Sequence, residues 1–436
     1  MKKLIFFWKE LLTTFWFLPV MLICSSIFLS IVFVSVDKSI ELPEDYWMRF
    51  FLVTDPNSAR SILSTISGAM IGVAGTVFSV TLVALTLASS QFGPRLIKNF
   101  MYVKLNQVVL GSYIATYLYC LLILNSVKDN EGYTFIPSFS ILLAIFAAIV
   151  NIVLLIVFIH QIATSIQADK VVADISDFIT DQLDTLYTEK MGDEKGDIKL
   201  DVAPIFRFYR NKFSIKAPIS GYLQYVSSDD LFELISKENS LLTVHHRPGS
   251  FLVQGTEIAE LQTDSIWEQE KIESLLDQFV IGKTKTPQQD LEYSIHQMVE
   301  IAVRALSPGI NDPYTALSCI DNLTSTMSYL AQIKFPSKNR LDEEGVTRII
   351  AKTFEFEGLL NVSFNQIRQY SGGSTAVIIR LIEALITIQD FTSNSDQQKA
   401  VSRHIKMVLD LGERTIEEPN DLEDLRERAE DIVDIN

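Results

Sequence analysis

Residues 61–95, SILSTISGAMIGVAGTVFSVTLVALTLASSQFGPR, decide the fold of this chain. No ionisable side chain occurs from Ser61 to Pro94. At about 1.5 Å per residue, a helix of this length reaches roughly 50 Å, which exceeds the apolar core of a bilayer, about 30 Å thick. The stretch therefore predicts a membrane-spanning helix that is tilted or projects beyond the membrane.

Small and hydroxyl side chains recur along this helix, mostly three or four residues apart, so they gather on one side. They are Ser61, Ser64, Thr65, Gly68, Gly72, Gly75, Thr76 and Ser79. Two interpretations stay open. In one, small residues allow tight packing of neighbouring helices, for which Gly68-x-x-x-Gly72 is a familiar contact pattern. In the other, the stripe also lines a narrow pore at the axis of an oligomer, because channels can select with hydroxyls, backbone groups and apolar constrictions.

Apolar residues concentrate before about residue 163, in a chain of 436 residues that is 48% hydrophobic. This composition is too apolar for one soluble domain. It predicts a transmembrane domain over 1–163 with four spans, at about 12–36, 61–94, 105–126 and 137–163. The charged start of the chain resembles a signal peptide, but the apolar run continues without a cleavage signature of small residues, so we expect a retained span.

Basic residues in the short connections predict the orientation of these spans. They are Lys2, Lys3 and Lys9 before the first span and Arg95, Lys98 and Lys104 after the second. The other two connections have acids that match or outnumber their bases, so the positive-inside tendency predicts that both termini are cytoplasmic. Within the spans the ionisable side chains reduce to His160. Ion-coupled transporters usually keep charged groups at membrane depth, so this inventory argues against one.

The part after residue 163 has the patterns of a soluble α+β region. Residues 164–200 predict an amphipathic connecting helix, and 201–265 predict a small β-barrel or sandwich, because short β-type runs alternate with turn residues. A helical domain over 266–412 follows, with one helix expected at about 344–370, and then an acidic tail over 413–436 that is expected to form a solvated helix or to fray. The predicted fold class is thus a four-span α-helical membrane domain followed by a cytosolic α+β region.

Composition and spacing exclude several functions. The formal net charge of −16 makes nucleic acid a poor partner, since phosphate binding needs a basic field. Cys24, Cys120 and Cys319 are isolated, and His245 and His246 are expected on opposite faces of one strand, so neither set predicts a metal site. Nucleophile elbows, phosphate-cradling glycine loops and zinc-helix motifs are absent from the sequence, so we predict no catalytic residue, no cofactor and no enzyme.

The segment RALSPGINDPYTALSCIDNL, residues 304–323, contains a second candidate site. In one interpretation, free N–H groups at the start of the helix after Asp312 and the side chain of Arg304 form a pocket for an anion. In the other, Asp312 caps that helix, while Arg304, Ser307 and Asn311 hold the corner together. The second interpretation is favoured, because Asp312 itself would repel an anion.

These two motifs, SSQFGPRLIKNF and RALSPGINDPYTALSCIDNL, resemble a family of bacterial predicted membrane proteins known as domain of unknown function 2254. RPGSFLVQG and FNQIRQY also fit, so the resemblance covers nearly the whole chain. It implies several N-terminal spans in a bacterial inner membrane and a large soluble C-terminal region, and it carries over no reaction or substrate. We expect a homo-oligomer in the lipid bilayer, either channel-like or an anchored sensor or scaffold that binds a small cytosolic ligand or a partner protein.

Overall fold

The computed structural model describes residues 11, 14–39, 52–93, 104–130, 133–165, 167–188 and 205–433. The chain divides into two compact units, Met1–Lys170 and Val171–Asn436. Several features predicted above lie outside the described residues: the basic residues Lys2, Lys3, Lys9, Arg95 and Lys98, the end of the connecting helix over 189–200, and the last residues of the tail, 434–436.

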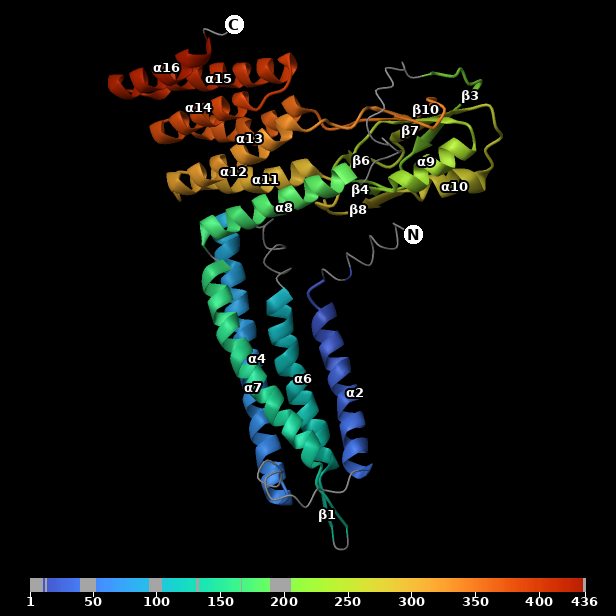
Figure 1. The fold of residues 1–436 in the computed structure, drawn as a ribbon, viewed down its shortest axis with the longest axis vertical. Coiled ribbons are helices and arrows are strands. Elements are labelled where there is room, and N and C mark those ends of the chain that lie inside the picture. Colours follow the sequence, from blue (N-terminus) through green and yellow to red (C-terminus); the bar gives the residue numbers. More distant parts are fainter. Residues whose placement is uncertain are drawn as a thin grey trace. The chain divides into compact units, whose positions relative to one another are not determined.

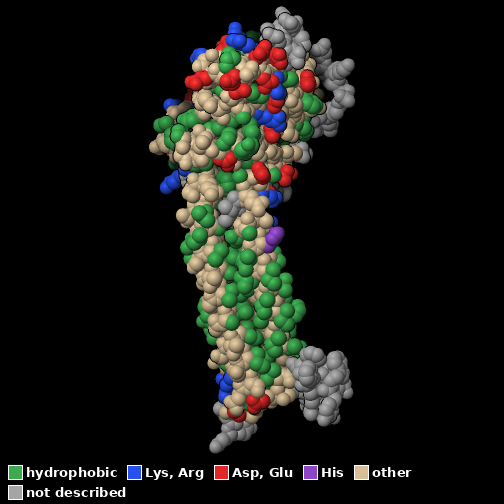
Figure 2. Space-filling view, turned by 90° about the vertical axis from the view of Figure 1, so that its left-hand side faces the viewer, with side chains coloured by type: hydrophobic (Ala, Val, Ile, Leu, Met, Phe, Trp, Pro, Cys, Tyr) green, Lys and Arg blue, Asp and Glu red, His purple; other side chains and the backbone are tan. Residues whose placement is uncertain are grey.

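Four helices among the described residues of the first unit are long and apolar enough to cross a membrane (Figure 1). They are α2 (Phe17–Ser39), α4 (Pro56–Phe92), α6 (Lys104–Ser126) and α7 (Ser138–Ser165). The four predicted apolar helices are therefore confirmed, with ends that differ by a few residues. The face drawn in Figure 2 shows hydrophobic side chains along the length of this unit.

Helix α4 begins earlier than its apolar stretch because Asp55 caps it. The Asp55 carboxylate accepts a hydrogen bond from the backbone N–H of Ser58 at 2.7 Å, and Pro56 takes the first helical position. A capping aspartate followed by proline is a favourable start for a helix. The polar turn thus adds to the apolar stretch, and α4 reaches 37 residues.

Helix α6 contacts each of the other three membrane helices. Its close approach to α2 depends on Gly111, where an added Cβ would lie 2.8 Å from the Cα of Pro19. Pro19 lies in the first turn of α2, where the N–H that proline lacks would have no partner inside the helix. The glycine therefore lets the two backbones approach closely, and the proline is tolerated at the contact.

Asp37, near the end of α2, caps the start of α7. Its carboxylate accepts hydrogen bonds from the backbone N–H groups of Phe139 and Ser140, at 2.9 and 3.0 Å, and from the Ser140 hydroxyl at 2.5 Å. A carboxylate at a helix N-terminus satisfies N–H groups that have no partner within the helix. This contact joins two helices that the sequence separates by about 100 residues.

The second unit contains a helix at its start, two β-sheets and a stack of helices. Helix α8 (Ala168–Thr188) buries Val172, Ile175, Ile179 and Leu183 at three- and four-residue intervals. Its Gln182 donates to the carbonyl of Pro287 and accepts from the Ser294 hydroxyl at 2.7 Å. These contacts join the predicted amphipathic helix to the rest of its unit.

The two sheets share one hydrophobic core. A five-stranded sheet has the order β3 (Asn211–Lys216), β7 (Glu257–Thr263), β5 (Leu241–Val244), β10 (Thr347–Ala351) and β9 (Asn339–Leu341). A three-stranded sheet has the order β6 (Phe251–Leu252), β4 (Gly221–Val226) and β8 (Phe279–Gly282). Leu223, Leu242, Leu261, Phe279 and Ile349 are buried together between them. Helices α9 (Ser228–Lys237) and α10 (Gln269–Leu276) complete this part.

The β region differs from its prediction in extent and closure. Strands β8, β9 and β10 lie beyond residue 265, and the helix predicted at 344–370 begins only at Phe356, because 347–351 is strand β10. Strand β10 pairs in parallel with β5, so its partner is far away in the sequence and leaves no local signal. Among the described residues the sheets do not close into a barrel, so the predicted barrel is not confirmed.

Six helices stack in successive layers in the rest of this unit (Figure 1). They are α11 (Leu291–Ala305), α12 (Pro313–Gln332), α13 (Phe356–Tyr370), α14 (Thr375–Asp390), α15 (Ser395–Thr415) and α16 (Pro419–Val433). Helix α16 lies in the predicted acidic tail, yet it contacts α14 and α15 and buries Leu425 and Ala429. These two apolar residues, four positions apart, give the otherwise charged helix one packed face, so it is not a solvated helix.

Candidate functional site

All eight residues of the predicted α4 stripe are exposed in this chain. The buried side of α4 is a different set at three- and four-residue intervals: Ala59, Leu63, Ser67, Met70, Ala74, Val77, Thr81, Ala84, Ala88 and Phe92. At about 100° of rotation per residue, the stripe lies nearly opposite this buried side. The chain therefore packs α4 through its heptad-like side and leaves the small-residue stripe uncovered by its own described helices.

The stripe has open space along its length. An added Cβ at Gly68, Gly72 or Gly75 would meet no heavy atom within 4 Å. The Thr65 hydroxyl donates to the carbonyl of Ser61 at 2.7 Å, so part of the polar surface is satisfied within the helix. Another group could therefore approach the α4 backbone closely along this side.

The exposed stripe of α4 extends beyond the eight residues predicted from the sequence. Thr86 and Ser90 are also exposed, and by helical rotation they fall on the same side of α4. Their hydroxyls donate to the carbonyls of Leu82 and Leu87, at 2.9 and 2.8 Å. The helical spacing of Thr86 and Ser90 was the sequence signal for this extension. It was missed because Leu82 and Val83 interrupt the run of small residues.

A polar cluster lies inside the membrane unit between α6 and α7. The Asn151 side-chain amide donates to the Thr116 hydroxyl at 2.8 Å, and the Tyr113 hydroxyl donates to the backbone carbonyl of Asn151 at 2.7 Å. All three side chains are buried. Hydrogen bonds between spans of this kind hold membrane helices together. The cluster therefore fixes the packing of α6 against α7.

In the second unit, the four predicted corner residues lie at the junction of two helices, from Arg304 in the last turn of α11 to Asp312 at the start of α12. The Ser307 hydroxyl donates to the Arg304 carbonyl at 2.6 Å, the Asn311 N–H donates to the Ser307 carbonyl at 2.9 Å, and Asn311 has a φ of 51°. The Asp312 carboxylate accepts from the N–H and the hydroxyl of Thr315, at 3.2 and 2.5 Å. The start of α12 thus carries its own anion, which is the geometry of a helix cap.

The two adjacent histidines follow β5. His245 Nε2 lies 3.0 Å from a carboxylate oxygen of Glu257, whereas the pKa of His246 is lowered by burial and then by the charges of Lys352 and His245. The described residues contain no group of three or more His, Cys, Asp or Glu arranged to hold a metal ion. The pair therefore differs in its partners and in its electrostatic surroundings.

Comparison with known proteins finds a matching family and related proteins. The profile of a family described as predicted membrane protein, DUF2254, matches residues 13–387. The chain belongs to this family. An uncharacterized protein of Mycobacterium bovis and one of Mycobacterium tuberculosis are each 30% identical to it over 375 residues, which cover 84% of this chain and 70% of each relative. No solved structure matches it.

Membership of the DUF2254 family confirms the resemblance that was inferred from the sequence motifs. The matched residues 13–387 include the α4 stripe, the corner before α12 and both sheets, whereas α15 and α16 lie beyond them. A membrane protein with four apolar helices is what the family and the structure establish together.

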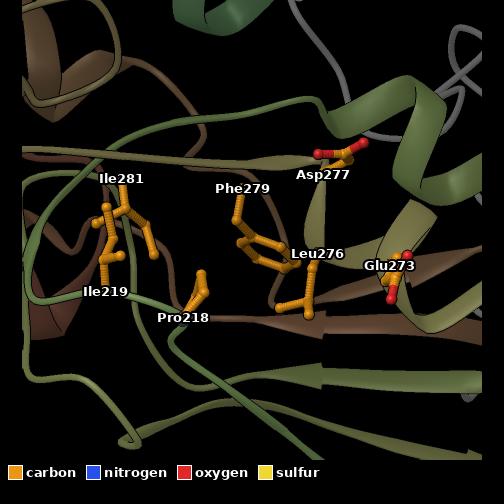
Figure 3. Close-up of a pocket in the computed structure, with 7 residues that line it drawn as sticks. All are labelled: Pro218, Ile219, Glu273, Leu276, Asp277, Phe279 and Ile281. Carbon is orange, nitrogen blue, oxygen red and sulfur yellow. The ribbon is translucent and has the colours of Figure 1, made fainter. Parts of the chain in front are cut away.

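The DUF2254 chain also has a surface pocket of about 420 Å³ beside its three-stranded sheet. Figure 3 shows Pro218, Ile219, Leu276, Phe279 and Ile281 around it, with the carboxylates of Glu273 and Asp277 at its margin. Such a lining suits an apolar group beside a positive charge.

Proposed function

We propose that this protein is a homo-oligomeric, channel-like protein of a bacterial inner membrane, with both termini in the cytoplasm. In the proposal, the stripe of α4 lines or closes a passage between subunits, and the second unit acts as a gate or sensor. The observation that carries it is the exposure of the whole stripe on the side of α4 opposite the chain's own packing.

The free-energy cost of glycine in a helix supports a close neighbour on the stripe side of α4. Each glycine in a helix costs about 1 kcal/mol relative to alanine, and glycine offers lipid no side chain to contact. Three exposed glycines on one stripe therefore favour a close neighbour or a passage. Small residues promote association of membrane helices because they let backbones approach, and a second copy of the chain presents the same side.

The passage is proposed to select without fixed charge. Within the described spans, α4 has no ionisable side chain after Arg60, and α7 has none except His160. Hydroxyls, backbone groups and apolar constrictions can still select and gate, so the lining suits a channel better than a coupled transporter.

Cysteine cross-linking in native membranes tests the assembly. Ser64→Cys and Ser79→Cys should form disulfide-linked dimers under mild oxidation, in a chain whose exposed Cys24 is replaced by Ser. Val80→Cys is the matched control, since Val80 is exposed on α4 and lies about 160° from Ser64 and about 100° from Ser79 in helical rotation. Equal cross-linking at the stripe and at Val80, or none at the stripe, would contradict the proposed interface.

Flux through liposomes tests the passage. The purified protein should conduct potassium or chloride, and Gly72→Leu should reduce this flux at least tenfold, because the added side chain enters space that is open in the single chain. Ile71→Leu should leave flux unchanged. Cross-linked oligomers that conduct neither ion under any applied voltage would refute the channel.

The alternative is a membrane-anchored sensor or scaffold without transport. It is favoured by one observation, the two surface pockets of the second unit, which has its own hydrophobic core. This alternative predicts cross-linking without flux, together with ligand-dependent melting of the purified protein.

A further inference from the structure

A second pocket, of about 440 Å³, opens at the carboxyl ends of two parallel strands in the five-stranded sheet. Strands β5 and β10 pair in parallel, with Val244 opposite Ala351, so the chain leaves both strands on the same side. The residues that follow β5 are His245, His246 and Arg247, and Lys352 follows β10. All four line the pocket, together with Ser250, Lys338, Thr353 and Glu355. The carboxyl ends of parallel strands are a frequent place for ligands.

The first wall of this pocket is a turn held in place from several directions. Residues Arg247–Ser250 form a β-turn closed by a hydrogen bond from the Ser250 N–H to the Arg247 carbonyl at 3.1 Å. Gly249 has a φ of 92°, and an added Cβ there would collide with the carboxylate of Asp290, which is buried. Proline followed by glycine suits this turn type, and the close contact requires glycine. The wall is therefore fixed before any ligand arrives.

The basic side chains of the pocket differ in how strongly acidic partners already bind them. Arg247 is already engaged, since it pairs with Glu292 and its guanidinium lies 4.5 Å from the ring centre of Phe354. Lys338 pairs with Glu355 at 2.7 Å, and both side chains are mostly exposed, so this pair is weak. Lys352 is exposed and carries a charge that acts on His246. Burial lowers the pKa of His246, and the charge of Lys352 lowers it further, so the His246 ring lies close to this cation.

We propose that this pocket binds the phosphate group of a small anionic ligand, with Lys352 and His246 as its principal contacts and Lys338 as a third. A ligand phosphate is negatively charged, so Lys352 and Lys338 would attract it, whereas they would repel a positively charged ligand. The volume accommodates more than the phosphate itself, so a phosphomonoester such as a nucleotide fits the class. The inference is independent of the proposed channel, because it concerns the second unit alone.

Calorimetric titration of the purified full-length protein in detergent tests the proposal. The probes are inorganic phosphate, adenosine monophosphate and vesicles of phosphatidic acid, at constant ionic strength, which separate a free phosphate from a phosphomonoester and a lipid headgroup. Saturable binding of at least one probe is expected. Lys352→Gln with His246→Gln should weaken it tenfold or more, as the loss of contacts to a charged group predicts.

Two matched variants make the test sharper. Lys399→Gln removes the same charge from an exposed position on α15 and should leave binding unchanged. Glu355→Gln removes the acid that competes for Lys338 and should tighten binding several-fold. Absence of binding by all three probes would overturn the proposal. Binding that responds equally to Lys352→Gln and Lys399→Gln would do the same, since it would reflect net charge only.

Discussion

At the scale of single residues, the clearest electrostatic consequence concerns His404 in α15. Its side chain is fully buried, and Nε2 lies 2.9 Å from Oδ1, the side-chain amide oxygen of Asn361. Burial, followed by the charges of Arg403 and Arg368, lowers the pKa of His404 to about 4. The unfolded chain binds this proton near pH 6.5, so stability should be lost as the pH falls from about 6.5 to about 4.

The size of this loss is roughly 3 kcal/mol at most, because each pKa unit corresponds to about 1.4 kcal/mol. Thermal unfolding of the purified protein at pH 7.5, 5.5 and 4.5 measures it. His404→Gln keeps an amide donor toward Asn361 and cannot titrate, so its melting temperature should fall less over this range. The pKa of Asp290 is raised by burial, which acts in the opposite direction, but it affects both proteins equally. Parallel pH profiles would show that His404 does not titrate on unfolding.

At the scale of helices, the contact between α2 and α6 depends on the absence of one side chain. Gly111→Ala places a Cβ 2.8 Å from the Cα of Pro19 and 2.9 Å from Leu22, so the two backbones must separate. We expect a loss of about 1–3 kcal/mol, the usual cost of overpacking. Thermal unfolding in detergent measures it.

The matched control for Gly111 is Gly358→Ala in α13, which lies outside the proposed subunit interface. Nothing lies within 4 Å of an added Cβ there, and alanine favours the helix by about 1 kcal/mol, so unfolding should be unchanged or shifted upward. If the two alanine variants were equally stable, α2 would not approach α6 through Gly111.

At the scale of the whole molecule, the division into two units has a direct consequence. The fragment Gln167–Asn436 contains the second unit, with both sheets, their common core and the helix stack. We expect it to be soluble and to unfold cooperatively without the membrane unit, because its core is complete within it. Circular dichroism and size-exclusion chromatography test this. A fragment that aggregates, or that melts without a transition, would show that the second unit needs the first for its fold.

Features that arise from local physics could be predicted from the sequence alone. Four apolar helices follow from length and hydropathy alone, because a bilayer core requires long apolar segments. Asp312 and Pro313 begin α12 where the sequence places them, because a cap acts through its own turn. The family was recognisable from motifs that are long and contiguous.

Features that depend on contacts between distant residues could not be predicted without the three-dimensional fold. The sequence showed that α4 carries a stripe of small residues, but not that the chain packs through the opposite side, because either side could meet a neighbour. Strand β10 was hidden since its partner β5 is remote, and the pocket between their ends was hidden with it. The packed face of α16 rests on Leu425 and Ala429, which composition masks among charges. Whether a residue is buried depends on the element that packs against it as well as on the residue itself, and the fold determines that element.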